Sequence, residues 1–166
     1  MKQFKSGIFF WVVFCCSILS LSSCKDPYTE QIEEQREFDE QSIQAYLTAN
    51  NIQNAVRQAS GVYYVPQTAG TGDLIKRGNT VRMHYITKSL GGYKYQSTYD
   101  TGQAATIRVG TDQVTPGLTE GLQLLKNGEK ASIIVPSHLA YGVYGDGYII
   151  PPNDIILYDI TVLDVD

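Results

Sequence analysis

Residues 139–152 read LAYGVYGDGYIIPP, and the interpretation of the whole sequence depends on this stretch. Its three glycines and its aspartate, Asp146, are typical of a loop, but the stretch also contains three tyrosines and two isoleucines. Loops normally lie on the surface and are polar. An apolar loop therefore either packs into the core of its own domain or forms the wall of an apolar binding site. Composition alone leaves both alternatives open.

The 166 residues are enough for one domain with an appendage. The formal net charge is −4 and no cluster of Lys and Arg stands out, so we expect no nucleic-acid partner. Tyrosine is frequent, with 12 copies, and each copy offers apolar area together with a hydroxyl that can position a ligand.

The N-terminus has the pattern of a targeting signal. Lys2 and Lys5 precede an apolar run at 7–21 that is short for a membrane span, and the run ends in Leu-Ser-Ser-Cys at 21–24. This ending resembles the bacterial lipoprotein signal, in which the cysteine is acylated. We therefore predict a signal peptide at 1–23 and a lipidated Cys24, and hence a protein that is anchored to a membrane of the bacterial cell envelope, with the outer membrane favoured. A plain secretory peptide and an uncleaved anchor helix are the alternatives.

The cysteines agree with this prediction. Cys15 and Cys16 leave with the signal peptide, so the mature chain keeps only Cys24 and forms no internal disulfide.

Residues 24–59 are predicted to be a lipidated N-terminus and a helical spacer. Glu and Gln dominate from position 28 to about Asn54, without Gly or Pro between Thr29 and Ser60. Thr29 is the expected cap. Helical spacing of apolar residues improves after position 42, which predicts a solvated first half and a second helix or half-helix from about Ser42 that packs on the domain. A dimerisation arm is the alternative, but the heptads are poor.

Residues 60–166 are predicted to form an α+β domain of five or six antiparallel strands and one short helix. Period-two runs occur at 62–65, 80–87, 93–96, 106–109, 130–135 and 155–165. The helix signal is PGLTEGLQLL at 116–125, where Leu118, Leu122 and Leu125 share one side; Asn127 and Gly128 are expected to end it.

Five blocks of this domain occur in the order of a known family. They read VRMHY at 81–85, VTPGLTEGL at 114–122, KNGEK at 126–130, LAYG at 139–142 and IIPPN at 149–153. In sequence and spacing they resemble the FKBP-type peptidyl-prolyl cis-trans isomerases. The resemblance implies a strongly bent antiparallel sheet wrapped around the short helix, with the ligand site between them and residues 139–152 as one of its walls.

The resemblance also implies which residues form the site. Those with a catalytic role would be Tyr85, Leu118, Tyr141 and Tyr158. Those that bind substrate would be Tyr95, Gln96, Val114, Thr115, Ala140, Ile149 and Ile150. Leu118 would be the floor, while the Tyr141 hydroxyl and the Thr115 backbone amide would hold neighbouring substrate carbonyls. No cofactor and no metal are expected, and the separated His84 and His138 are read as a strand residue and a surface or cap residue.

Four positions depart from the family pattern. Gln96 replaces an aspartate, Leu118 a tryptophan, Thr101 an arginine and Ala105 an aromatic residue. The expected function is isomerisation of X–Pro bonds in unfolded or proline-containing envelope proteins, with an FK506-like macrolide as a candidate ligand. The departures motivate an alternative, a catalytically weak FKBP-like chaperone or peptide-binding module.

Overall fold

The structure of the protein is a computed structural model that describes residues 27–166. The predicted signal peptide at 1–23 and the predicted lipidation site Cys24 lie outside the described residues. The helices are α1 (Pro27–Ala49) and α2 (Pro116–Leu122), with 3-10 turns η1 (Ser137–Leu139) and η2 (Gly142–Tyr144). The strands are β1 (Val56–Arg57), β2 (Tyr63–Thr68), β3 (Thr71–Leu74), β4 (Thr80–Ser89), β5 (Lys94–Ser97), β6 (Ala105–Arg108), β7 (Lys126–Asn127), β8 (Lys130–Val135) and β9 (Ile156–Val165).

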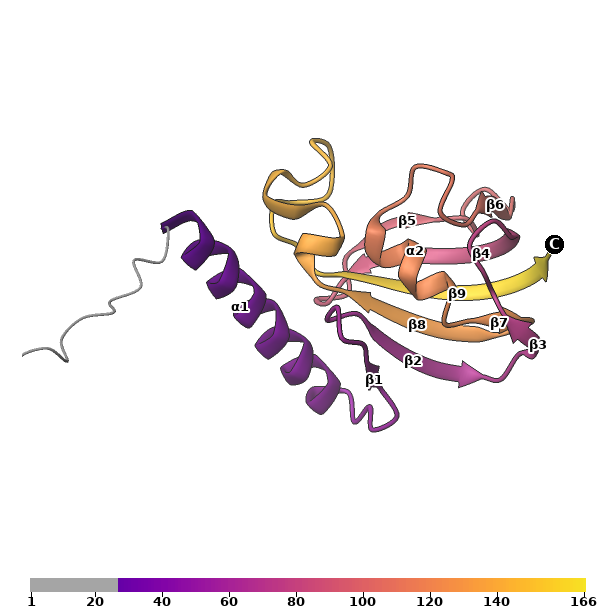
Figure 1. Cartoon of the computed structure of the whole chain (residues 1–166), viewed down its shortest axis with the longest axis horizontal. Coiled ribbons are helices and arrows are strands. Elements are labelled where there is room, and N and C mark those ends of the chain that lie inside the picture. Colours follow the sequence, from indigo (N-terminus) through magenta and orange to yellow (C-terminus); the bar gives the residue numbers. More distant parts are fainter. Residues whose placement is uncertain (1–26) are drawn as a thin grey trace, which may run out of the picture.

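The main sheet is antiparallel throughout and confirms the predicted α+β class (Figure 1). Its strand order is β1-β2-β8-β9-β4-β5, and β6 also pairs with β4. The long β4 reaches both partners because β6 pairs with its first half and β5 with its second half. The six predicted strands are all present. The short β1, β3 and β7 are additional, and β3 pairs with β7 in a separate two-stranded sheet.

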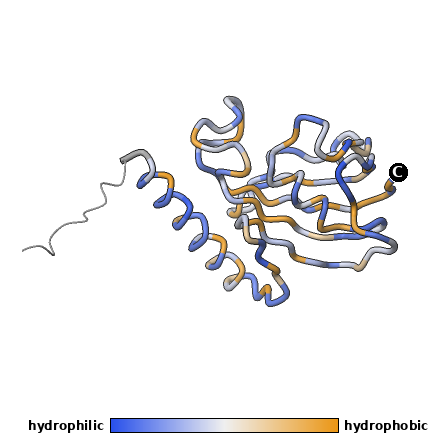
Figure 2. Tube along the Cα trace, viewed as in Figure 1, coloured by the Kyte–Doolittle hydropathy of each residue, from blue (hydrophilic) through white to orange (hydrophobic). Residues whose placement is uncertain are grey.

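The alternation along β8 and β9 gives the sheet two apolar faces. On β9, Ile156, Tyr158, Ile160 and Val162 belong to the cluster that includes Leu118 and Leu122 of α2. The intervening Leu157 and, on β8, Ile134 belong to a second cluster on the other face. Hydrophobic positions are accordingly frequent along these strands (Figure 2). Each face is covered by one helix, α2 on the first and α1 on the second.

α2 approaches the sheet closely because two of its residues have no side chain. A Cβ at Gly117 would lie 2.1 Å from Val135 Cγ1, and a Cβ at Gly121 would lie 2.6 Å from Ile133 Cγ2. Real Cβ atoms do not approach other atoms so closely, so any larger residue at these positions would push α2 away from β8.

α2 is shorter than predicted. It ends at Leu122 rather than at Asn127-Gly128, because the chain tightens into i→i+3 bonds and Asn127 then pairs with β3 as part of β7. Leu125 nevertheless lies in the core with Leu118 and Leu122, as the sequence predicts.

α1 is one continuous helix, so of the two alternatives predicted from about Ser42 a separate second helix is wrong, and the half-helix agrees with the structure. The helix begins at Pro27, so Thr29 lies inside it rather than at its N-cap. It ends at Ala49, five residues before Asn54, where the helical composition was expected to end. The predicted packing of the second half is confirmed, because Ile43 and Leu47 are buried in the second cluster. Figure 2 shows that most of the helix is hydrophilic, as expected for an element that covers only one side of the domain.

A buried carboxylate joins α1 to the segment that leads into residues 139–152. Asp39 is fully buried, and its Oδ2 accepts hydrogen bonds from Ser137 N at 2.8 Å and Ser137 Oγ at 2.7 Å. Gln35 Nε2 donates to Asp39 Oδ1 at 2.8 Å. A charged acceptor with several donors is stable when buried, whereas donors without an acceptor are not.

The segment at 139–152 is organised by a second carboxylate. Asp146 Oδ1 accepts hydrogen bonds from the backbone N–H groups of Tyr148, Ile149 and Ile150, at 2.8, 2.9 and 2.8 Å. These bonds lower the pKa of Asp146 below its usual value, chiefly through Ile150 N–H. Gly145 has φ +65° and allows the loop to return tightly on itself, since a Cβ there would lie 2.2 Å from Ile150 O.

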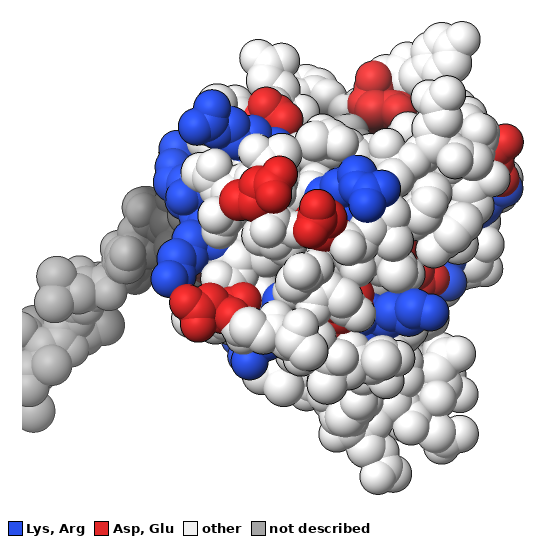
Figure 3. Space-filling view, turned by 90° about the vertical axis from the view of Figure 1, so that its right-hand side faces the viewer, with Lys and Arg blue, Asp and Glu red and all other residues white. Residues whose placement is uncertain are grey.

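Within residues 27–166 no helix has both the length and the hydropathy that a membrane span requires. Acidic and basic side chains are interspersed among uncharged ones on the face shown in Figure 3.

We expect Asp39→Ala to lower the free energy of unfolding by about 2–3 kcal/mol, because it leaves buried donors without their charged acceptor. Urea unfolding of the full chain in detergent measures the change. Glu37→Ala, at an exposed position on the same helix, is the control and should change stability by less than about 0.5 kcal/mol. Equal effects of the two substitutions would contradict the structural role of Asp39.

We expect Asp146→Ala to loosen residues 148–150 without unfolding the domain. Their amide hydrogens should exchange with solvent about tenfold faster, since each loses its acceptor. Hydrogen exchange followed by NMR measures this, and the amides of β8 serve as the internal reference. Unchanged exchange at 148–150 would show that Asp146 does not hold the loop.

Candidate functional site

A cavity of about 530 Å³ opens between α2 and the first face of the main sheet. Its size is typical of sites for small ligands or peptide side chains. Its walls come from β4, β5, β6, β9, α2 with the segment before it, and the turn between η1 and η2. The lining residues are Tyr85, Thr87, Gln96, Ile107, Gln113, Val114, Thr115, Leu118, Tyr141 and Tyr158.

The bottom of the cavity is apolar and rigid. Leu118, Ile107 and Tyr158 are buried, and all three belong to the main core cluster. Strand pairing fixes Tyr158 of β9 between Thr87 of β4 and Ile133 of β8. The floor is therefore a surface of the domain core, which holds its shape without a ligand.

Three hydroxyl groups meet above this floor. Thr115 Oγ1 and Tyr158 Oη lie 3.3 Å apart, and the Tyr158 hydroxyl is also hydrogen-bonded to the side chain of Tyr141. Burial raises the pKa of Tyr158 far above its usual value, and burial likewise raises the pKa of Tyr85. Both phenols therefore stay protonated at neutral pH, where they can donate hydrogen bonds.

Thr115 also fixes the start of helix α2. It is the N-cap of α2, and its Oγ1 accepts a hydrogen bond from Leu118 N at 3.3 Å. The start of α2 is thus fixed at the cavity wall, which positions Leu118 in the floor.

The loop at 139–152 plays both roles that its composition left open. Tyr141 lines the cavity, whereas Ile150 is 7% exposed and packs in the core together with the partly buried Leu139 and Ala140. Ile149 is 45% exposed and points away from the core.

Of the eleven predicted site residues, seven line the cavity and four lie elsewhere. Tyr95, Ala140, Ile149 and Ile150 are not part of its wall. Tyr95 Oη donates to Asp154 Oδ2 at 2.6 Å, so it fastens the end of the loop to β5. Burial, together with this bond, raises the pKa of Tyr95 to about 12.

Three further lining residues, Thr87, Ile107 and Gln113, are missing from the sequence prediction. Thr87 follows Tyr85 at a spacing of two on β4, and this periodicity would have placed it on the same face. Ile107 and Gln113 are brought to the site by the pairing of β6 with β4 and by the turn before α2, which no local pattern specifies.

The departures from the family pattern have different positions. Gln96 is exposed at the mouth of the cavity and Leu118 forms the floor. Thr101 bonds locally through its Oγ1 to Thr98 O, and Ala105 pairs with Met83 in the sheet.

Neither histidine lies in the cavity wall. His84 contacts Thr98 Oγ1 through Nδ1 at 3.0 Å and stacks on Tyr99, which agrees with a strand residue that makes local contacts. His138 is partly buried beneath α1 rather than on the surface. No three His, Cys, Asp or Glu residues of the described chain lie close enough together to hold a metal ion.

The cavity wall contains no carboxylate, thiol, imidazole or amine. It can therefore interact with a ligand only through apolar contact and through hydrogen bonds of hydroxyl or amide groups. Such a site can bind an apolar segment and orient the peptide groups beside it. It is suited to a reaction that requires a change of shape and no proton transfer.

Comparison with known proteins agrees with this geometry. The family model described as FKBP-type peptidyl-prolyl cis-trans isomerase matches residues 72–163. A probable FKBP-type peptidyl-prolyl cis-trans isomerase of Haemophilus influenzae is 42% identical over 106 residues, which are 64% of this chain and 43% of the relative. The outer membrane protein MIP of Legionella longbeachae is 36% identical over 122 residues, 73% of this chain and 52% of the relative. The chain thus spans about half the length of these relatives.

The fold gives the same result. The crystal structure of FkpA from Escherichia coli superposes with a TM-score of 0.68 at 29% identity, over 83% of this chain and 64% of that chain. The residues that the family model matches include all five sequence blocks and all ten residues of the cavity wall. The chain belongs to the FKBP-type peptidyl-prolyl cis-trans isomerase family.

Proposed function

We propose that the protein is a peptidyl-prolyl cis-trans isomerase that binds X–Pro segments of other proteins in the cavity between α2 and the sheet. The observation that carries the proposal is the closed apolar floor of Leu118, Ile107 and Tyr158 beneath a group of protonated hydroxyls. Proline fits such a floor because its ring is apolar and it has no N–H group to satisfy.

The reaction needs no acid, base or metal. Rotation about a peptide bond crosses a barrier of about 18–20 kcal/mol, because the twisted amide loses its resonance. At X–Pro bonds the uncatalysed process takes tens to hundreds of seconds. A cavity that excludes water disfavours the polar planar amide relative to the twisted one, and a shape that fits the twisted form lowers the barrier further.

Each lining group has a proposed role in this reaction. Leu118 and Tyr158 would hold the proline ring, with Tyr85 and Val114 beside it. The Tyr141 hydroxyl would donate to a substrate carbonyl, and the Thr115 backbone amide to the neighbouring carbonyl. Orientation by one or two such bonds would favour the conformers closest to the transition state.

The four predicted residues outside the cavity wall retain a proposed part in binding. Ile149 is exposed beside the site and would contact the substrate chain directly. Ile150 and Ala140 would act through the core that supports Tyr141, and Tyr95 through its bond to Asp154. Gln96 would contact substrate at the mouth of the cavity.

The proposed substrates are unfolded or proline-containing proteins of a bacterial envelope, reached from a membrane through a lipid on Cys24. Support comes from the lipoprotein-like ending at 21–24 and from the relative whose name is outer membrane protein MIP. An FK506-like macrolide is a further candidate ligand, since a cavity of about 530 Å³ with an apolar floor and hydrogen-bonding walls is suited to such a compound.

A second candidate function is peptide binding with little catalysis, as in a chaperone. Two observations favour it. Leu118 leaves more room at the floor than the tryptophan of the family pattern, and Gln96 places an uncharged amide where that pattern has a carboxylate. A wider site orients a substrate less strictly, which lowers turnover more than binding.

The isomerisation rate of proline tetrapeptides in the presence of the full chain in detergent separates the two functions. We expect acceleration well above the spontaneous rate, and a kcat/KM about three- to tenfold lower in Tyr141→Phe, as for the loss of one hydrogen bond. Tyr144→Phe is the matched control, because Tyr144 is 86% exposed on the same loop. A folded protein without acceleration would favour the binding module, and equal rates for both variants would remove the orienting role of Tyr141.

The lipid anchor is tested by Cys24→Ala. Without the thiol no acyl chain can be attached, so we expect the protein to move from the membrane fraction to the soluble fraction of the cells, as measured by fractionation and immunoblotting. Cys15→Ala, within the predicted signal peptide, should leave the distribution unchanged. Retention of the Cys24→Ala protein in the membrane fraction would contradict the anchor.

A further inference from the structure

Asp39 is a buried acidic residue in the middle of α1, and the proposed reaction does not use it. Asp39, Ile43 and Leu47 follow one another at intervals of four residues, so they share one side of the helix. Ile43 and Leu47 pack in the second cluster. A carboxylate on this side is costly to bury, whereas an apolar residue would continue the packing. The acidic group therefore points to a role other than attachment of the helix.

The bonds of Asp39 hold the first residue of the turn η1. Asp39 Oδ2 accepts hydrogen bonds from Ser137 N at 2.8 Å and from Ser137 Oγ at 2.7 Å, and Ser137 is itself buried. Ala140 N donates to Ser137 O at 3.0 Å, which closes the turn. The next residue is Tyr141, which lines the candidate site. A single hydrogen-bonded turn thus connects Asp39 with Tyr141.

The helix α2 holds the same turn through a different residue. A Cβ at Gly117 would lie 3.1 Å from Leu139 O, so the backbone of η1 lies directly on the start of α2. Leu139, Ala140 and Tyr141 also pack against the main core cluster. The position of Tyr141 therefore depends on two contacts of η1, one with α2 and one with α1.

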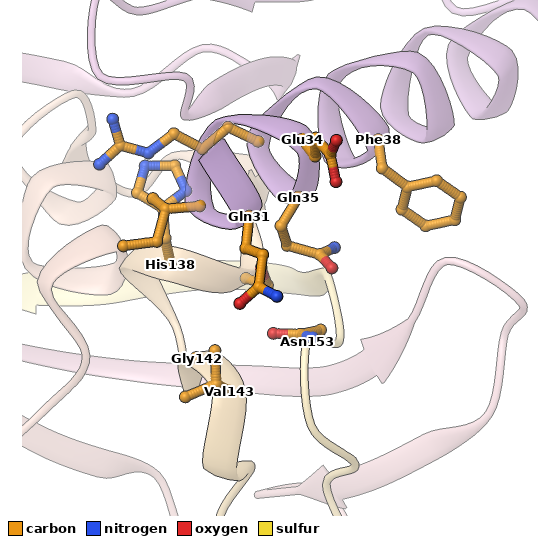
Figure 4. Close-up of a pocket in the computed structure, with 11 residues that line it drawn as sticks. Gln31, Glu34, Gln35, Phe38, His138, Gly142, Val143 and Asn153 are labelled. Atoms are coloured by element: carbon orange, nitrogen blue, oxygen red, sulfur yellow. The ribbon is translucent and has the colours of Figure 1, made fainter. Parts of the chain in front are cut away.

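Farther from Asp39, α1 stands apart from this loop. A cavity of about 600 Å³ lies between the first half of α1 and the segments that carry η2 and Asn153. Figure 4 shows Gln31 and Gln35 reaching from α1 toward Asn153 across this space. The Gln35 amide donates to Asp39 Oδ1 at 2.8 Å and so orients the carboxylate. The contact of α1 with the loop is thus concentrated at Asp39 and Ser137.

We propose that Asp39 is a positioning residue of the isomerase site, which fixes the Tyr141 hydroxyl relative to the substrate by holding η1 through Ser137. The proposal rests on the proposed function. Asp39 is not one of the residues that line the cavity, so it acts through the turn and not by contact with the substrate. A displacement of about 1 Å at an orienting group is enough to slow a reaction. α1 thus contributes to the isomerase site as well as to stability.

The alternative is that Asp39 only attaches α1 to the domain. Leu47→Ala separates the two roles, because Leu47 is also buried on α1 but lies about two turns farther along the helix. Its cluster joins α1 to Tyr63 of β2, Ile134 of β8 and Leu157 of β9. Leu47→Ala should lower stability at least as much as Asp39→Ala. A loss of activity that came from a loosened helix would then appear in both variants.

The test measures kcat/KM for a proline tetrapeptide on the full chain in detergent, at a temperature where thermal unfolding shows that each variant is folded. We expect Asp39→Ala to lower kcat/KM about threefold, as for the partial loss of one orienting hydrogen bond. Leu47→Ala should change it by less than about 1.5-fold, because the folded variant keeps the turn intact. Asp39→Asn retains an oxygen that can accept both bonds from Ser137, and should stay within about 1.5-fold of the wild type.

A double-mutant cycle with Tyr141→Phe tests the path from Asp39 to the hydroxyl. If Asp39 acts by positioning this group, Asp39→Ala should lower kcat/KM by less than about 1.5-fold once the hydroxyl is absent. An effect that reaches the site by another path would appear in full in both backgrounds. Ser137→Ala removes one of the two donors to Asp39 and replaces Asp39→Ala if that variant does not fold; its expected loss is about twofold, with the same dependence on Tyr141.

Equal kcat/KM for Asp39→Ala and Leu47→Ala, a loss that Asp39→Asn does not recover, or a loss of the same size in the Tyr141→Phe background would each overturn the inference. If the wild-type chain does not accelerate isomerisation, the proposed function has failed. Fluorescence anisotropy of a labelled proline peptide then tests the inference alone. Affinity about threefold weaker in Asp39→Ala but not in Leu47→Ala would support it, and equal affinities would overturn it.

Discussion

The close contact between α2 and β8 is the constraint on which the candidate site depends. Because Gly117 and Gly121 have no side chain, the helix lies directly on Val135 and Ile133. This contact brings Leu118 to the floor of the cavity, opposite strand β9. A helix displaced by even one methyl group would move the floor, the N-cap at Thr115 and the hydroxyl network together. The geometry of the candidate site is therefore set by the same packing that stabilises the domain.

The loop at 139–152 depends on this core from one side and on α1 from the other. Ile150 is anchored in the cluster beneath the sheet, and Asp146 folds the tip by accepting three backbone N–H groups. Two residues before this loop begins, Ser137 donates hydrogen bonds to the buried Asp39 of α1. Tyr141 is positioned between these two attachments. An N-terminal helix that the sequence suggests is a spacer thus also supports one wall of the site.

How much the sequence could predict follows from the range of the interactions involved. Period-two patterns, such as that of residues 155–165, are local and predicted the strands and the inward side of Tyr158. The order of the family blocks predicted the cavity residues Tyr85, Leu118 and Tyr141. Ile149 and Ile150 are adjacent, but the first side chain is exposed and the second is buried. The fold of the loop around Asp146, which no local pattern specifies, determines this difference. The cavity of about 600 Å³ between α1 and the turns η1 and η2 could not be predicted, since it joins segments about a hundred residues apart that meet only in the tertiary structure.

The central claim is that this site accelerates isomerisation by shape and exclusion of water, without proton transfer. The pH dependence of kcat/KM for a proline tetrapeptide tests the claim most directly. The lining residues include no carboxylate, imidazole, thiol or amine, and the pKa values of Tyr85 and Tyr158 are raised by burial. The account predicts a constant kcat/KM from about pH 6 to 9 and the same value in D₂O. A bell-shaped profile, or a rate several-fold slower in D₂O, would contradict it.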